Sequence, residues 1–261
     1  MLKRKSKDGG FAFCNPLPSS LPETFYAVYI LNAIGEEIED KDRLVEFLLG
    51  KLNPDIYSIF YVYSTLSILN EDLPDYSEFL LKRLYEAAKR NPNSKLKGEH
   101  GITATYSFEN PNILREIYMI VSCLRFLGRD VRGEVKDFVR CFKRNGGYGI
   151  GRATLKDTFY AVSVLKENGD TVKFVMEHEC ESGGFSKHPH SYPPYLEDTY
   201  YAISILNLLD HRYKSGKTVK YILSLQNPDG GFRRSIYGGI STLEDSYYAI
   251  ASLRLMEVEE R

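Results

Sequence analysis

The chain has 261 residues, of which 43% are hydrophobic and 26% charged, a balance typical of a folded globular protein and not of a disordered one. The 34 Lys and Arg residues stand against 35 Asp and Glu residues, so the net charge of -1 gives no basis for binding nucleic acid or an anionic membrane. No apolar run approaches the roughly 20 residues of a membrane-spanning helix. The four cysteines (Cys14, Cys123, Cys141 and Cys180) lack a disulfide or zinc spacing, so we expect reduced thiols and a cytoplasmic location.

Taken in chain order, the sequence repeats one pattern. Four Gly-Gly-aromatic triplets begin at Gly9, Gly146, Gly183 and Gly230. The apolar segments that follow them are LPETFYAVYIL from Leu21, LKDTFYAVSVL from Leu155, LEDTYYAISIL from Leu196 and LEDSYYAIASL from Leu243. Weaker copies of the segment start at Ile56 and Leu114. Six units in a chain of this length average about 43 residues each, enough for two helices and two connections.

The two helices of a unit differ in character. The segments above are apolar and aromatic nearly all round, which is typical of interior helices. The stretches 43–52, 78–90, 134–144, 171–179 and 217–225 alternate charged and apolar residues with helical spacing and predict surface helices. We therefore expect an all-α fold, an α/α toroid of six hairpins and about twelve helices, spanning residues 1–261 as one domain. Because the first and last units are good copies and not polar caps, a closed ring is favoured over an open array.

The helix ends carry local signals. Each Gly-Gly pair is predicted to end an outer helix in a left-handed conformation. Ser20, Thr154 and Thr242 stand three residues before an acid, which predicts helix-capping hydroxyls. Tyr195 occupies this position before Asp198 and cannot cap in the same way.

The combination of Gly-Gly-Phe with Leu-x-Asp-x-x-Tyr at about 40-residue spacing resembles the β subunits of protein prenyltransferases and, more distantly, the squalene and terpene cyclases. The resemblance extends over nearly the whole chain. It implies a toroid whose aromatic central cavity holds an isoprenoid, a transferase activity, and a helical partner subunit.

The resemblance also implies site residues. Family members hold a zinc ion with an Asp, a Cys two residues later and a His in a later inner helix. Asp198 matches the Asp, but Tyr200 and Tyr248 occupy the other two positions, so we assign no metal or other cofactor. Asp198 and Tyr201 are the candidate catalytic residues. The candidate substrate-binding residues are Tyr26, Tyr160, Tyr200, Tyr248, Arg233 and Arg234, and other cations able to bind a diphosphate are Lys187, Arg152 and Lys156.

Two functions remain open. The first is a prenyltransferase-like protein that binds an isoprenoid diphosphate, or a similarly long apolar ligand, and transfers the prenyl group. The second is a catalytically silent toroid that binds a protein or peptide. A metal site formed by Asp198 with His188 and His190 is a weaker alternative, because loop histidines are by default solvated.

Overall fold

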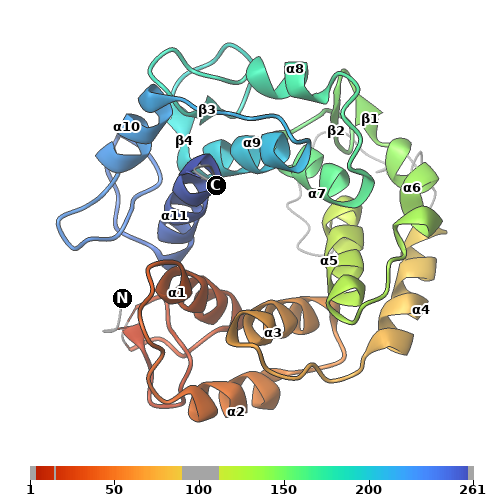
Figure 1. Ribbon diagram of the computed structural model, residues 1–261, viewed down its shortest axis with the longest axis vertical. Helices are drawn as coiled ribbons and strands as arrows, with labels where there is room; N and C mark the ends of the chain where they lie inside the picture. Colours follow the sequence, from red (N-terminus) through yellow and green to blue (C-terminus); the bar gives the residue numbers. More distant parts are fainter. Residues whose placement is uncertain (1–3, 15, 90–111, 258–261) are drawn as a thin grey trace, which may run out of the picture.

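The computed structural model describes residues 4–14, 16–89 and 112–257, which form two concentric layers of helices (Figure 1). The six inner helices are α1 (Leu21–Ala33), α3 (Ile56–Leu69), α5 (Ile113–Phe126), α7 (Leu155–Leu165), α9 (Leu196–Leu208) and α11 (Leu243–Glu257). The outer helices are α2 (Lys41–Lys51), α4 (Ser77–Ala88), α6 (Arg132–Arg140), α8 (Thr171–Met176) and α10 (Gly216–Ser224). Four two-residue strands are β1 (Lys143–Arg144), β2 (Gly147–Tyr148), β3 (Phe185–Ser186) and β4 (Pro194–Tyr195).

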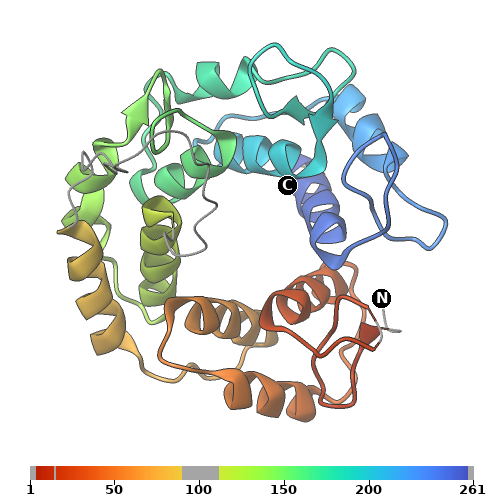
Figure 2. The same ribbon diagram turned by 180° about the vertical axis from the view of Figure 1, so that it is seen from behind.

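The inner helices form a closed ring. Each packs against the next, and α1 packs against α11 (Figures 1 and 2). The predicted α/α toroid is therefore confirmed. About twelve helices were expected, and the described part of the chain has eleven, because no outer helix follows α11 there.

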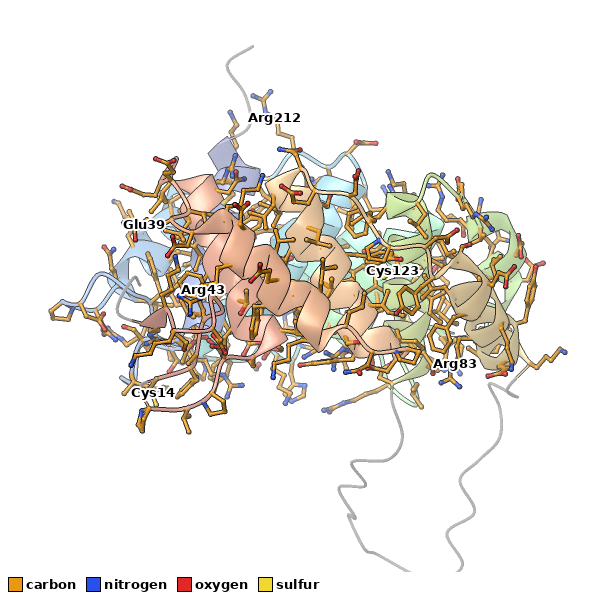
Figure 3. All side chains as sticks on the ribbon, turned by 90° about the horizontal axis from the view of Figure 1, so that it is seen from below. Cys14, Glu39, Arg43, Arg83, Cys123 and Arg212 are labelled. Carbon is orange, nitrogen blue, oxygen red and sulfur yellow. The ribbon has the colours of Figure 1, made fainter. Side chains whose placement is uncertain are left out.

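All inner helices begin at the same rim of the ring, which we call the N-terminal rim. Residues at the starts of neighbouring inner helices contact one another. Asn112, the N-cap of α5, donates to Asp157 of α7, and the Lys156 ammonium of α7 lies 2.9 Å from Glu197 of α9. In the side view of Figure 3, Cys14, which precedes α1, and Arg212, which follows α9, lie on opposite rims.

The predicted capping residues are confirmed. The hydroxyls of Ser20, Thr154 and Thr242 accept hydrogen bonds from the backbone N–H three residues later, at 3.4, 3.0 and 2.8 Å. Tyr195 makes no side-chain cap. These bonds satisfy N–H groups that have no partner within the helix and so fix where each inner helix starts.

The prediction that the Gly-Gly pairs end the outer helices is wrong, although the predicted left-handed conformation is found. The first glycine of each pair is left-handed, with φ between 83° and 92°, but it does not end a helix. Gly146, Gly183 and Gly230 lie several residues after an outer helix has ended, and no described outer helix precedes Gly9. For example, α8 ends at Met176, and the Gly183 N–H donates to Cys180 O at 2.9 Å. A left-handed glycine suits a helix end and a bulged hairpin turn equally well, so the residue type does not distinguish them. α6 stops at Arg140, short of the expected 144, because residues 143–144 form β1 of the hairpin that contains Gly146.

A hydroxyl fixes each hairpin to its inner helix. The backbone N–H of the triplet's aromatic residue is buried and donates to the Ser or Thr that follows the repeated acid. The four bonds, between 2.9 and 3.1 Å, join Phe11 to Thr24, Tyr148 to Thr158, Phe185 to Thr199 and Phe232 to Ser246. This recurring Ser or Thr was visible in the sequence as TFYA, TYYA and SYYA.

We predict that Thr199→Val lowers the free energy of unfolding by about 1–3 kcal/mol, because it leaves the buried Phe185 N–H without an acceptor. Thr65→Val is the matched control. The buried Thr65 hydroxyl donates only to Tyr61 O, at 2.7 Å within α3, so its loss leaves no N–H unpaired. Urea denaturation of both variants measures the difference, and equal losses would contradict the anchoring role.

Candidate functional site: an aromatic cavity at the ring centre

A cavity of about 580 Å³ lies at the centre of the ring. Side chains from all six inner helices line it, and most of them are Tyr or Phe. The recurring alanines that follow the repeated acid by four residues (Ala27, Ala161, Ala202 and Ala249) are buried, where a small side chain lets helices approach closely. Closure of the ring thus leaves an open centre whose wall is supplied by the repeat itself.

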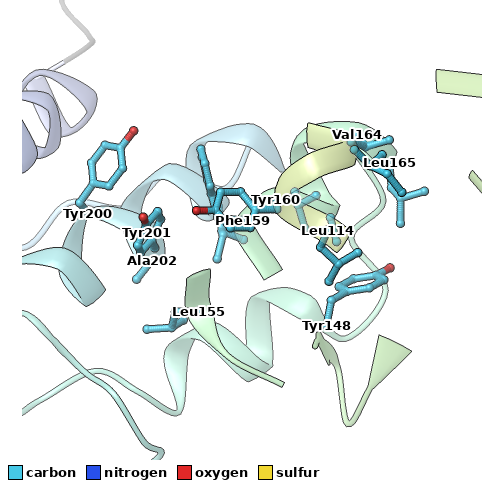
Figure 4. Packing of buried hydrophobic residues seen from close by; sticks show 14 of the residues in the cluster. Leu114, Tyr148, Leu155, Phe159, Tyr160, Val164, Leu165, Tyr200, Tyr201 and Ala202 are labelled. Atoms are coloured by element: carbon cyan, nitrogen blue, oxygen red, sulfur yellow. The ribbon is translucent and has the colours of Figure 1, made fainter. Parts of the chain in front are cut away.

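The aromatic rings form a continuous belt around this cavity. Every pair of neighbouring inner helices is joined by at least one contact between rings. In order around the circle, one contact from each interface is Phe25–Tyr61, Phe60–Tyr118, Tyr118–Tyr160, Phe159–Tyr201, Tyr200–Tyr248 and Tyr26–Tyr247. The centroids of these pairs are 4.9 to 5.8 Å apart, within the range of favourable aromatic packing. Figure 4 shows Phe159, Tyr160, Tyr200 and Tyr201 on this wall.

Several phenol hydroxyls of the belt bond to one another or to a carboxylate. Glu244 accepts hydrogen bonds from Tyr26 at 3.1 Å and from Tyr248 at 2.9 Å, and the hydroxyls of Tyr200 and Tyr247 are 2.8 Å apart. Burial raises the pKa of Tyr200 to about 12, so this phenol stays protonated at neutral pH. These hydroxyls complete the wall and do not supply a nucleophile.

Two cations also line the cavity, at its N-terminal rim. The Arg115 guanidinium lies 5.7 Å from the Tyr57 ring centroid, and the Lys156 ammonium lies 5.6 Å from that of Tyr201. Lys156 pairs with Glu197, whereas no described carboxylate forms an ion pair with Arg115. Lys156 was among the predicted cations, and Arg115 was missed.

One sequence signal would have found Arg115. It directly precedes the repeated acid, and the equivalent positions carry Pro22, Tyr57, Lys156, Glu197 and Glu244. All of these except Glu197 line the cavity. The residue before each acid therefore sets the charge of the rim, which is positive on α5 and α7 and negative on α9 and α11.

Five of the eight predicted site residues line the cavity: Tyr26, Tyr160, Tyr200, Tyr201 and Tyr248. The other three, Asp198, Arg233 and Arg234, are not among the lining residues. The Arg233 guanidinium is engaged by Asn227 Oδ1 at 2.8 Å and Ser224 O at 3.0 Å. That of Arg234 lies 5.1 Å from the Tyr195 ring centroid.

Asp198 is half-buried on α9, and no described residue donates a hydrogen bond to its carboxylate. Burial and the neighbouring Glu197 raise its pKa to about 6, against the opposing influence of Lys187, Arg234 and Lys156. The carboxyl therefore titrates close to neutral pH.

The residues present do not fit the zinc site that the resemblance implies. The Tyr200 and Tyr248 hydroxyls that replace the Cys and His ligands are bonded to Tyr247 and Glu244. Protonated phenols are poor zinc ligands. Across residues 4–14, 16–89 and 112–257, no three or more His, Cys, Asp or Glu side chains are grouped so that they could hold a metal ion. The alternative site at Asp198 with His188 and His190 is therefore not formed there.

Within the same described residues, no helix has the length and apolar character needed to cross a membrane.

Comparison with known proteins agrees with this architecture. Residues 1–65 and 155–261 match the family model described as the prenyltransferase alpha-alpha toroid domain. Among solved structures, the chain is similar to Candida albicans protein geranylgeranyltransferase-I complexed with GGPP, with a TM-score of 0.71 and 17% sequence identity. The match covers 90% of this chain and 83% of that one, and at this identity it shows a shared fold. No curated protein matches the chain.

The raised pKa of Asp198 predicts a pH dependence of stability. Its folded-state pKa of about 6 exceeds the value of about 3.9 for an exposed Asp, so between these pH values the folded protein holds a proton that the unfolded chain has released. This group therefore makes stability fall as pH rises through that window. We expect Asp198→Asn to remove the fall and to raise the free energy of unfolding at pH 7 by about 1–2 kcal/mol.

Asp229→Asn is the control of opposite sign. Hydrogen bonds from Ser241 and Gly231 lower the pKa of Asp229, so its ionised form stabilises the folded state. Urea denaturation from pH 4 to 7 should show lower stability for Asp229→Asn at pH 7. Parallel pH curves for wild type and Asp198→Asn would contradict the assignment.

Proposed function

Because the chain belongs to the prenyltransferase alpha-alpha toroid family, we propose that its central cavity binds the hydrocarbon chain of an isoprenoid diphosphate. The observation that carries this proposal is the unbroken aromatic belt around a cavity of about 580 Å³. Small-molecule sites are typically about 300–1,000 Å³ and mostly apolar. The similar Candida albicans structure is described as a complex with GGPP, a ligand of this chemical class.

The diphosphate is proposed to bind at Arg115 and Lys156. These cations lie on adjacent inner helices, at the same position of the repeat, where the side chain faces the cavity rim. Arg and Lys are the usual partners of phosphate oxygens, and helix N-termini add a favourable dipole. Of the cations suggested by the sequence, Lys156 lines the cavity, whereas Arg152, Lys187, Arg233 and Arg234 do not.

Prenyl transfer is the finer part of the proposal. In such a transfer the bond between the prenyl carbon and the diphosphate oxygen breaks, and the acceptor forms a bond to that carbon and loses a proton. Arg115 and Lys156 would stabilise the charge on the departing diphosphate. Asp198 and Tyr201 stay predictions as catalytic residues: Tyr201 lines the cavity and Asp198 does not, although a carboxyl with a pKa of about 6 suits proton transfer near neutral pH. The cytoplasmic location and a helical partner subunit also remain predictions.

The second candidate function is a catalytically silent toroid that binds a protein or peptide. Two observations favour it: the zinc-ligand positions carry bonded phenols, and the loops before the inner helices expose large apolar side chains. Tyr237, Ile240 and Tyr192 are 72%, 69% and 59% exposed, and all lie in loops that lead into α9 or α11. Exposed apolar groups of this size gathered at one rim are typical of binding surfaces.

Isothermal titration with farnesyl and geranylgeranyl diphosphate tests the ligand assignment. We expect Arg115→Met and Lys156→Met each to weaken binding by about tenfold or more, because each removes a charge-assisted contact to phosphate. Neither change should affect binding of the corresponding alcohols. Lys173→Met is the control, since Lys173 is an exposed cation of α8 away from the cavity.

The outcomes separate the two functions. Absence of binding by folded wild-type protein at millimolar ligand would contradict the isoprenoid proposal and favour the peptide-binding one. Equal affinities for diphosphate and alcohol would retain the apolar site and contradict the anion site.

A further inference from the structure

The Gly-Gly pairs show how an outer helix is seated on the ring. In three repeats the second glycine lies under an aromatic side chain of the outer helix that follows. The pairs are Gly10 with Phe47 of α2, Gly147 with Phe174 of α8 and Gly184 with Tyr221 of α10, and a Cβ added to each glycine would come within 2.6 Å of the ring. Glycine is needed there because the helix packs this closely. We call the surface over the second glycine the seat, and in these three repeats the aromatic side chain of the outer helix fills it.

The fourth Gly-Gly pair has no helix on it. Gly231 is the second glycine of this pair, and the atoms nearest to a Cβ added there belong to Ser241 and Asp229, with no aromatic ring of an outer helix. Gly230, the first glycine, has a φ of 83°, and a Cβ added there would meet no atom of the described chain within 4 Å, whereas one added to Gly183 would come within 2.4 Å of Lys217 in α10. No outer helix follows α11 in the described residues, and in Figure 1 only loops and the N-terminal segment lie outside the ring between α10 and α2. The seat is built and is not filled by this part of the chain.

A groove of about 450 Å³ lies at that place. We call it the sixth-helix groove and define it by its apolar lining residues Ile30, Ile34, Phe232, Leu243 and Ile250. These come from α1, from the residue that ends it, from the fourth triplet and from α11. The groove is therefore the same type of surface, between two neighbouring inner helices, that the outer helices cover elsewhere.

Equivalent positions of the repeat confirm that this surface is uncovered. Two positions of the repeat lie beneath an outer helix: the fifth residue after the repeated acid on one inner helix, and the eleventh after it on the next. Beneath α2 these are Val28 of α1 and Leu69 of α3, which are 0% and 6% exposed. Beneath α10, Ile203 and Met256 hold the same two positions and are 2% and 7% exposed.

In the sixth-helix groove the equivalent residues are Ile250 and Ile34. Ile250 is only partly buried, and Ile34 is 56% exposed. Burial of the equivalent side chains stabilises the folded protein through the hydrophobic effect, and Ile250 and Ile34 lack part of that stabilisation.

One end of the groove is charged. Arg4 and Asp229 line it, and the Asp229 carboxylate already accepts hydrogen bonds from Ser241 and from the Gly231 N–H. The Arg4 Nη1 is buried without a hydrogen-bond partner among the described residues, while its Nη2 donates to Ser241 O at 2.6 Å. A buried unpaired guanidinium nitrogen favours an incoming acceptor. Acidic residues are favoured in the first turn of a helix, as Asp42 is in α2, so a helix entering this groove would place its acceptor near Arg4.

We propose that the sixth-helix groove binds an amphipathic helix of a partner protein, in the position that α2, α8 and α10 hold on their own repeats. The helix needs about nine residues, the length of α10. It presents Phe or Tyr to Gly231 within its first two turns, an aliphatic residue directly after it, and an acid in its first turn. A second copy of this chain is the poorer occupant, because each outer helix in the described residues already has its buried face on its own ring.

A peptide supplied in trans tests the groove directly. The probe is a fluorescein-labelled, lactam-stapled peptide of residues 40–52, which contains α2 with its first-turn Asp42 and its Phe47, the ring that packs on Gly10. Fluorescence polarisation should show saturable binding, weakened about tenfold or more by Ile34→Arg in the protein and by Phe47→Ala in the peptide. Leu49→Arg is the matched control, since Leu49 is an apolar residue of α2 that is 45% exposed outside the groove.

Thermal unfolding of the variants shows that they are folded, which Ile34→Arg should be because its site is already solvent-exposed. Absence of binding by wild type up to about 1 mM peptide, or equal binding by wild type and Ile34→Arg, would overturn the proposal. Analytical ultracentrifugation tests whether a second copy of the chain occupies the groove. A dimer that Ile34→Arg dissociates would assign the groove to that second copy and overturn the proposal. Isoprenoid binding is unaffected by either result, because none of the five residues that define the groove lines the central cavity.

Discussion

The packing of α1 against α11 is the constraint on which the rest of this structure depends. It joins residues more than two hundred positions apart in the sequence, through the Tyr26 hydroxyl on Glu244 at 3.1 Å and the Tyr29 and Tyr247 rings at 4.7 Å. Without this contact the inner helices would form an arc, and their aromatic faces would line an open trough. With it, the same side chains, which come from all six inner helices, enclose a cavity. The cavity therefore depends on ring closure more than on any single residue.

Much of the fold could be predicted because the same local sequence signals recur in each repeat unit. The capping hydroxyls at Ser20, Thr154 and Thr242 mark the starts of inner helices, and helical periodicity separates inner from outer helices. The glycine pairs were placed wrongly, since a left-handed glycine fits a helix end as well as a hairpin turn. Tertiary contacts decide between a helix end and a hairpin turn. The hydroxyl of Thr199 or its equivalent holds the hairpin, and the next outer helix packs on the second glycine.

The site was predictable in its apolar part and less so in its charged part. Tyr26, Tyr160, Tyr200, Tyr201 and Tyr248 recur at repeat positions that a ring must turn inward, so the sequence places them on the cavity wall. Arg115 escaped notice because its unit has a weak copy of the pattern, although it holds the same repeat position as Lys156. Which hydroxyls are bonded and which cations are engaged depends on contacts between units, as with Arg233 and its own loop, and a linear pattern does not contain these contacts.

A crystal structure of the protein with geranylgeranyl diphosphate would show whether the closed ring holds an isoprenoid chain as proposed. We expect electron density for the chain within the aromatic belt, between Tyr118 and Tyr247, with the diphosphate on Arg115 and Lys156. Density for the ligand outside the ring, or a centre in which the belt side chains have collapsed to fill the cavity, would contradict this proposal.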